Sequence, residues 1–411
     1  MAAQRSALFL SLKNFLPKGT ALEELKIPFH KPEYGEEEIR EVTETIRSGW
    51  ITTGPKVRDF ERAFAAEIGV KHALAVNSGT AAMHVALEAL GIKEGDEVIT
   101  VPFTFVATSE VILYCKAKPV YVDCSPESFN ILADRIEEKI TARTRAILPV
   151  HFAGQACELN PIKRIAERYS LKLVEDAAHS FPTLYEGKKV GVFGDATCFS
   201  FYATKTLSTG EGGMLVTPHD EVIERARLLS LHGITRDAWK RYQNPGAWRY
   251  DVVTLGRKYN MSDIQAAIGL QQLRKSARFL ERRRRIAASY LEAFRGCELL
   301  RTPACGSFES HAWHLFVIKL EIEKLSISRD EFMEKMRSAG IGTSVHFIPL
   351  SEHPYYQEKL GLKPEDFPNT SDCFKRIVSL PIYPGMSDED AGFVAQKVLE
   401  ILQSADLKRP L

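Results

Sequence analysis

The sequence of 411 residues lacks a dominant sign of charge. Lysine and arginine number 54 against 53 aspartate and glutamate residues, which leaves a formal net charge of +1. A broad surface that neutralises phosphates needs a marked basic excess, so we do not expect nucleic acid as a partner. The densest basic run, Arg282–Arg285, lies in a helical pattern, and we interpret it as a solvated helix face.

Cysteine pairs with the spacing of a metal site or a disulfide framework are also absent. The seven cysteines are scattered, and no two of them form a C-x-x-C pair. We therefore expect no metal site and the reduced thiols of a cytoplasmic protein. No apolar run reaches about 18 residues, so no membrane-spanning helix is expected. The apolar stretch 7–12 is too short for a signal peptide and lacks a cleavage site, which leaves a loose N-terminal arm.

What the sequence does contain is an alternation of short apolar runs and helical patterns. This alternation is typical of an α/β protein with a mostly parallel central sheet that helices cover on both faces. After residue 265 the pattern changes to one long helical stretch, 262–295, followed by a few strands and helices. We predict an N-terminal arm (1–27), a large domain (28–270) and a smaller C-terminal α+β domain (271–411).

Residues that could bind a ligand or take part in catalysis come directly after several of the apolar runs. In open α/β sheets, ligands bind beyond the carboxyl ends of the strands, so we expect these residues to converge on one edge of the sheet. They are Gly79, Thr80, Phe105, Asp176, Ser200 and Lys205.

Each of these residues has an ordinary structural explanation by itself, such as a helix cap, a core aromatic or a surface lysine. Together they are the parts that pyridoxal 5'-phosphate (PLP) needs. A helix N-terminus at Gly79 suits a phosphate, and an aromatic side chain can stack on a planar ring. Asp176 can hold a protonated ring nitrogen, while Lys205 can form an imine and move a proton.

The same alternation of strands and helices also allows a nicotinamide-dependent oxidoreductase. Its usual fingerprint, G-x-G-x-x-G, is absent from the first predicted strand–helix turn, where the sequence is NSGTAAM (77–83). We therefore favour the PLP interpretation.

Seven segments of the sequence resemble the DegT/DnrJ/EryC1/StrS family of sugar aminotransferases. These are PLP enzymes with the aspartate aminotransferase-like architecture, PLP fold type I, and the resemblance runs from about residue 28 to 400. The segments are SGWITTGP (48–55), NSGTAAMHVAL (77–87), PFTFVAT (102–108), VEDAAHS (174–180), FSFYATKTLSTGEGGM (199–214), HGITR (232–236) and YNMSDIQAAIGL (259–270).

Within this family the chain is most similar to the UDP-4-amino-4-deoxy-L-arabinose–oxoglutarate aminotransferase type. SGWITTGPK (48–56), HAWHLFVI (311–318) and the segment 327–347 carry this similarity. It implies that glutamate leaves as 2-oxoglutarate, that pyridoxamine 5'-phosphate is the intermediate, and that the amine passes to C4 of a nucleotide-linked ketosugar. The product would serve a cell-surface glycan or lipid A.

Two alternatives remain beside this assignment. One is a C3-ketosugar or other sugar aminotransferase of the same family, as for an antibiotic-type amino sugar. The other is a non-catalytic protein that keeps the PLP fold. The intact Lys205 argues against the dehydratase branch, in which a histidine replaces this lysine.

The resemblance implies a role for individual cofactor-binding residues. Lys205 would be the Schiff-base lysine and would carry the proton, and Asp176 would pair with the pyridinium nitrogen. Phe105 would stack on the ring, and His179 would lie near the phenolic oxygen. The residues implied for the phosphate are Gly79, Thr80 and Ser200.

Asn260 would reach the phosphate of the neighbouring subunit's cofactor, which implies a homodimer with shared active sites. The substrate contacts that the resemblance suggests are Trp50, Thr53, Tyr202 and His346. Tyr202 departs from many members, which have histidine there. Because the net charge is close to zero, anionic ligands need local donors, for which Arg236 and Arg257 are further candidates.

Overall fold

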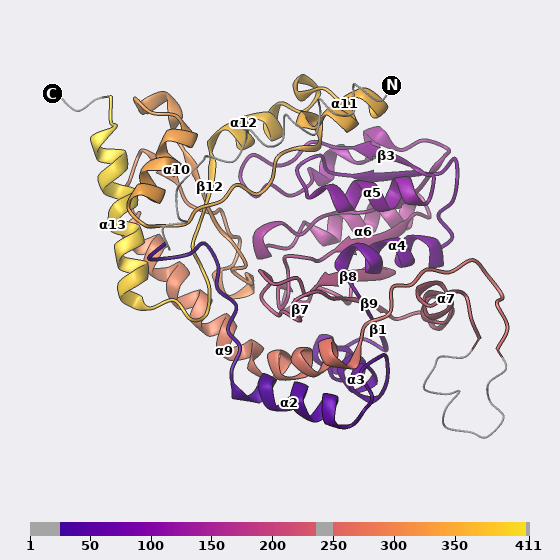
Figure 1. The fold of residues 1–411 in the computed structure, drawn as a ribbon. Coiled ribbons are helices and arrows are strands. Elements are labelled where there is room, and N and C mark those ends of the chain that lie inside the picture. Colours follow the sequence, from indigo (N-terminus) through magenta and orange to yellow (C-terminus); the bar gives the residue numbers. More distant parts are fainter. Residues whose placement is uncertain (1–24, 236–249, 408–411) are drawn as a thin grey trace, which may run out of the picture.

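A seven-stranded sheet forms the centre of the protein (Figure 1). The computed structural model describes residues 25–235 and 250–407, so the apolar stretch 7–12 and Arg236 lie outside the described residues. The strand order is β1-β9-β8-β5-β4-β2-β3. The strands are β1 (His72–Val76), β2 (Glu97–Thr100), β3 (Lys118–Tyr121), β4 (Thr144–Ile147), β5 (Lys172–Asp176), β8 (Ala196–Ser200) and β9 (Gly213–Thr217).

The sheet is parallel except for β9, which confirms the predicted mostly parallel sheet. β9 pairs antiparallel with β1 on one side and with β8 on the other. The end of β8 lies beside the start of β9 in the sheet. The connecting loop 201–212 therefore stays at the carboxyl edge of the sheet. This loop carries Lys205.

Helices bury both faces of the sheet. In β1, Leu74 and Val76 belong to the core beneath α4 and α7, while Ala73 and Ala75 belong to the core beneath α3. This alternation follows from the two-residue period of a strand and explains why the strands are apolar runs. The helices of this part are α2 (Glu36–Arg47), α3 (Pro55–Ile68), α4 (Gly79–Ala89), α5 (Val106–Tyr114), α6 (Leu159–Arg168) and α7 (Asp220–Ser230).

One long helix, α9 (Asp263–Ala293), connects the two parts of the chain. It begins beside α2 and α3 and ends beside α13 (Figure 1). Ser262 caps the helix by accepting a hydrogen bond from the Gln265 N–H. The carboxylate of Asp263 accepts hydrogen bonds from the backbone at Gly54 and Val57, at 2.8 and 3.0 Å, and so fixes the start of α9 against that of α3.

The C-terminal part builds a second core around an antiparallel sheet of three strands. Ile27 packs into this core together with Trp313 and the second half of α9. The predicted boundary at residue 270 falls inside α9, and the division into domains stays a prediction. The elements are β10 (Leu300–Arg301), β11 (Phe316–Leu320), β12 (Ile377–Leu380), α10 (Arg329–Ser338), α11 (Pro354–Leu360), α12 (Pro368–Arg376) and α13 (Asp388–Ser404).

The prediction that Arg282–Arg285 is a solvated helix face is wrong for Arg283. This side chain is 1% exposed, because α9 passes between the two parts and one side of the run faces inward. Its Nη1 donates to the carbonyl groups of Trp313, His314 and Ile382 at 3.1, 3.2 and 2.8 Å. Burial lowers the pKa of Arg283 to about 10.

Among the described residues, no helix is long and apolar enough to cross a membrane. A small hairpin of β6 (Leu184–Tyr185) and β7 (Lys188–Lys189) completes the strands.

Candidate active site

A cavity of about 570 Å³ lies at the carboxyl edge of the central sheet. This volume is within the range of about 300–1,000 Å³ that is typical of small-molecule sites. Most of the residues that the sequence singles out line it: Gly79, Thr80, Phe105, Asp176, His179, Ser200, Tyr202, Lys205 and His346. Trp50, Thr53 and Asn260 do not line it.

The N-terminus of α4 forms one wall of the cavity. Ser78 caps this helix, and its hydroxyl accepts a hydrogen bond from the Ala81 N–H at 3.0 Å. A Cβ atom on Gly79 would lie 2.9 Å from the Cβ of Ser200, so only glycine lets α4 approach the end of β8 this closely. The first backbone N–H groups of a helix have no intrahelical partner, and they favour an anion such as a phosphate.

Asp176 ends β5 and is 4% exposed. Its Oδ2 accepts a hydrogen bond from Thr108 Oγ1 at 2.8 Å, and its Oδ1 accepts one from the Ala178 N–H at 3.1 Å. Burial raises the pKa of Asp176, and these two donors oppose that shift by stabilising the carboxylate. The arrangement holds a carboxylate in a fixed orientation at the floor of the cavity.

Lys205 is half-buried in the loop between β8 and β9. Its backbone N–H donates to the Tyr202 carbonyl at 2.9 Å, and the Thr209 N–H donates to Phe201 at 2.9 Å, so the loop is tied back to its own start. Burial lowers the pKa of Lys205 to about 8, although the carboxylate of Asp176 acts in the opposite direction. An amine with this pKa exchanges protons readily near neutral pH.

His179 is buried beside these two residues. The Ala153 N–H donates to its Nδ1 at 3.3 Å, so the proton of the neutral ring is on Nε2. Burial, followed by the positive charge of Lys205, holds the pKa of His179 well below its ordinary value. The Phe347 ring stacks on it at a centroid distance of 5.3 Å.

The C-terminal part closes the cavity with two further histidines. His314 is 4% exposed, and its ring centroid lies 4.5 Å from that of His179. The Nδ1 of His346 lies 3.0 Å from Ser379 Oγ, and burial lowers the pKa of His346 to about 4. Phe105 stands at the mouth, 57% exposed, with its ring 6.0 Å from Phe347.

Trp50, Thr53 and Asn260 form a separate cluster outside the cavity. Asn260 Nδ2 donates to Thr53 Oγ1 at 2.7 Å, and Trp50 Nε1 donates to the Thr53 carbonyl at 3.0 Å. Arg257 also lies outside the cavity lining, with its guanidinium 2.9 Å from Glu88.

The sequence alone indicates no role for Thr108 or His314. Thr108 lies in the first turn of α5, and its hydroxyl group is 2.8 Å from that of Thr104, which precedes the Phe105 cap of this helix. Helix periodicity gives no signal for this pair, because Thr104 lies before the start of α5. His314 lies in the segment HAWHLFVI, but only the folding of the C-terminal part against the large one brings it to the cavity.

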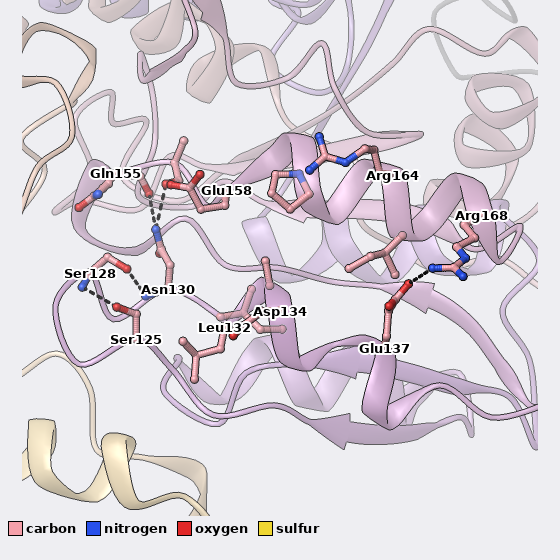
Figure 2. A pocket seen from close by; sticks show the side chains of 15 residues that line it. Ser125, Ser128, Asn130, Leu132, Asp134, Glu137, Gln155, Glu158, Arg164 and Arg168 are labelled. Atoms are coloured by element: carbon pink, nitrogen blue, oxygen red, sulfur yellow. Dashed lines mark hydrogen bonds and ion pairs between the residues drawn. The ribbon is translucent and has the colours of Figure 1, made fainter.

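A second hollow, of about 720 Å³, lies between the loop 125–137 and α6 (Figure 2). Several of its polar groups already have partners. Asn130 Nδ2 donates to the carbonyl groups of Gln155 and Ala156, and Arg168 pairs with Glu137 at 3.0 Å. This hollow lacks the buried titratable groups of the first cavity, so we assign the chemistry to the cavity around Lys205.

The residues present fit PLP. The start of α4 at Gly79 offers backbone N–H groups to a phosphate, Asp176 is buried and oriented, and Lys205 carries an amine of lowered pKa in the same cavity. The fold and this site together define a PLP-dependent aminotransferase of fold type I.

Comparison with known proteins gives the family. The model of the DegT/DnrJ/EryC1/StrS aminotransferase family matches residues 32–399, and the chain belongs to this family. The chain is 50% identical over 376 residues to an uncharacterized protein of Methanocaldococcus jannaschii, covering 92% of this chain and 97% of that protein. It is 48% identical over 381 residues to the spore coat polysaccharide biosynthesis protein SpsC of Bacillus subtilis, covering 92% and 98%.

Among solved structures, the chain is similar to a putative sugar aminotransferase of Streptococcus pneumoniae in its PMP form. The TM-score is 0.86 at 32% identity, with 92% of this chain and 100% of that chain covered. The same protein has been solved in a PLP form. The chain is therefore a sugar aminotransferase with PLP as its cofactor, consistent with amino sugar biosynthesis for polysaccharides.

Proposed function

We propose that the protein transfers the amino group of glutamate to the keto carbon, C4, of a nucleotide-linked ketosugar. The observation that supports the transaminase chemistry is that Lys205, Asp176 and the start of α4 line the same cavity. The choice of glutamate, of C4 and of a nucleotide-linked sugar is supported by the resemblance of 48–56, 311–318 and 327–347 to the UDP-4-amino-4-deoxy-L-arabinose type. That subtype stays a prediction, because none of the similar proteins reported above is named as an enzyme of this type.

PLP supplies an electron sink that makes a carbon next to the transferred amine acidic. In each half of the reaction, Lys205 Nζ would carry a proton between that carbon of the substrate and the C4′ carbon of the cofactor. Its lowered pKa suits both directions near neutral pH. Asp176 would hold the proton on the ring nitrogen, and Thr108 keeps its carboxylate oriented.

His179 would act as a hydrogen-bond donor through Nε2, because its Nδ1 is occupied by the Ala153 N–H. Phe105 and Tyr202 line the mouth and are 57% and 47% exposed, so they would contact the larger sugar substrate or the cofactor ring. Because closure of the cavity against water strengthens these polar contacts, we expect a second subunit to cover this mouth.

We propose a homodimer in which Asn260 acts in the neighbouring site. Asn260 lies outside the cavity of its own chain, in a cluster with Thr53. Large apolar side chains are exposed at the cavity mouth and in the 250–255 segment, including Phe105 and Leu255, which is 80% exposed. Exposed apolar surface of this kind is typical of an interface between subunits.

The test is the Lys205→Ala variant with glutamate and a panel of nucleotide 4-ketosugars and 3-ketosugars. We expect the wild type to convert a 4-ketosugar, with mass spectrometry detecting the aminated product and NMR placing the new amine at C4. Lys205→Ala should lose the visible absorbance of the lysine-bound cofactor and the turnover. Wild-type turnover in Lys205→Ala would overturn the proposal. A product with its new amine at C3 would show that the enzyme acts at C3 rather than at C4.

A further inference from the structure

A buried positive charge stands behind one wall of the cavity. Arg283 is 1% exposed, and its guanidinium donates only to main-chain carbonyl groups. Within residues 25–235 and 250–407, no carboxylate pairs with it, and its Nε has no hydrogen-bond partner. A buried charge that no opposite charge compensates is costly, so an anion nearby would stabilise it.

His314 connects this charge to the cavity. Its carbonyl accepts from Arg283 Nη1 at 3.2 Å, while its imidazole lines the cavity. The Nδ1 of His314 is buried and has no hydrogen-bond partner in the described part of the chain. Buried polar atoms of native proteins are almost always satisfied, so this nitrogen points to a ligand.

The groups that act electrostatically on His314 are all basic. They are His179 from the loop after β5, Lys205 from the loop before β9, Arg283 from α9 and His346 from the loop after α10. The pKa of His314 lies well below its ordinary value, mainly because the ring is buried and also because of these neighbours. The ring is therefore neutral at pH 7, in a surrounding that favours an anion.

The carboxylates that line the cavity do not neutralise this wall. Asp176 already accepts from Thr108 and Ala178, and in the proposed function it is engaged by the ring nitrogen. Glu211 is exposed. No arginine lines the cavity in the described residues, so an anionic substrate would meet histidines there.

We propose that His314, with His179 and His346 beside it and Arg283 behind it, binds a carboxylate group of the amino donor. The inference rests on the proposed function, since it assumes an amino acid as donor. Because His314 lines the cavity but is only 4% exposed, a small group such as a carboxylate would reach its ring. The bulky nucleotide sugar would remain at the open mouth near Phe105 and Tyr202.

Binding of the carboxylate is coupled to uptake of a proton. The negative charge raises the pKa of His314, so the neutral ring takes one proton from solvent and becomes a charge-assisted donor. No covalent bond changes in this step. Because a proton is bound with the ligand, affinity increases as pH falls, by up to about tenfold per pH unit when one full proton is taken up.

The experiment is a calorimetric titration of the PLP-loaded enzyme with glutarate, a dicarboxylate that has no amine and cannot react. The titration is made in two buffers with different ionisation enthalpies. The change in the measured binding enthalpy between the buffers, relative to the change in their ionisation enthalpy, gives the number of protons taken up. For the wild type we expect proton uptake and weaker binding at higher pH. His314→Ala should bind glutarate at least about tenfold more weakly at pH 6.5, the loss of one charge-assisted contact.

His314→Asn tests the charge separately from the shape. Asparagine keeps a hydrogen-bonding atom near the position of Nδ1 but cannot take up a proton, so we expect partial recovery of affinity without pH dependence. His219→Asn, at the start of α7 and outside the cavity lining, is the matched control and should bind like the wild type.

The visible absorbance of the lysine-bound cofactor keeps the two proposals apart. If every variant retains it and glutarate binds to His314→Ala and His314→Asn with wild-type affinity and pH dependence, the inference is wrong while the proposed function stands. Failure of the wild type to bind glutarate would also overturn the inference. The proposed function fails independently, if Lys205→Ala still transfers the amine.

Discussion

At the scale of single residues, burial rather than residue type gives Lys205 its chemistry. A lysine in water is protonated at neutral pH, and the cavity lowers the pKa of this one to about 8. The sequence predicts Lys205 after a strand end and before a glycine-rich turn, and the structure has it in the loop between β8 and β9 that lines the cavity. It cannot give the pKa, which depends on how completely the loop 201–212 is covered.

The lowered pKa predicts how cofactor loading depends on pH. Only the neutral amine attacks the aldehyde of PLP, so the loading rate of the apoprotein should rise by about tenfold per pH unit below pH 8 and level off above it. Stopped-flow absorbance of apoprotein mixed with PLP gives this profile. A rate that still climbs steeply between pH 9 and pH 10 would show an ordinary, solvated lysine instead.

Thr108 predicts a second residue-scale effect. Thr108→Val removes the hydroxyl that donates to Asp176 Oδ2 but keeps the shape of the side chain. A hydrogen bond to a charged group contributes about 1.5–3 kcal/mol, so PLP should dissociate about tenfold more readily or more. Thr108→Ser restores the donor and is the control. Equal dissociation constants for all three proteins, measured by equilibrium dialysis, would contradict this role.

At the scale of elements, the close approach of α4 and β8 is the feature that shapes the phosphate end of the cavity. Gly79→Ala places a methyl group 2.9 Å from the Cβ of Ser200, so the helix must move away from the strand. We expect weaker PLP binding with the fold retained, measured by absorbance titration and by circular dichroism.

Gly392→Ala is the matched control for that substitution. Gly392 lies inside α13, and a Cβ there would meet no atom within 4 Å. Because alanine is the better helix former, this variant should gain up to about 1 kcal/mol in free energy of unfolding and bind PLP like the wild type. If Gly79→Ala also bound PLP normally, the approach of α4 to β8 would not define the phosphate end.

The elements themselves were predictable to different degrees. Apolar runs such as β1 and capped helices such as α9 follow from the residue pattern and the capping residues. The two-residue strands β6, β7 and β10 do not, because so short a run has no measurable period. The antiparallel direction of β9 is also invisible in the sequence, since a buried strand has the same apolar pattern in either direction.

At the scale of the whole molecule, the location of Asn260 outside its own cavity leads to a prediction about subunits. Lys205→Ala and Asn260→Ala homodimers should each be impaired. A mixed dimer would contain one site with both intact residues, if Asn260 acts across the interface. We therefore expect co-expression of the two variants to restore activity above that of either one.

The contrary result has a clear form. If both residues act in the same chain, every site of a mixed dimer lacks one of them, and the activity would equal the mean of the two parents. Co-expression of wild type with Lys205→Ala, followed by separation of the species through two different affinity tags, calibrates the fraction of mixed dimers.

The antiparallel strand β9 also has a consequence for the order in which the protein forms during synthesis. β1 has β9 as its neighbour in the sheet, and the two pair from His72 with Thr217 to Val76 with Gly213. The ribosome must therefore release the chain beyond residue 217 before β1 can join the sheet. Because contacts so distant in sequence form slowly, the nascent chain exposes an unpaired apolar strand for most of the translation of its first half. Competence to bind PLP arises only when the segment that carries Lys205 has emerged and returned to that strand.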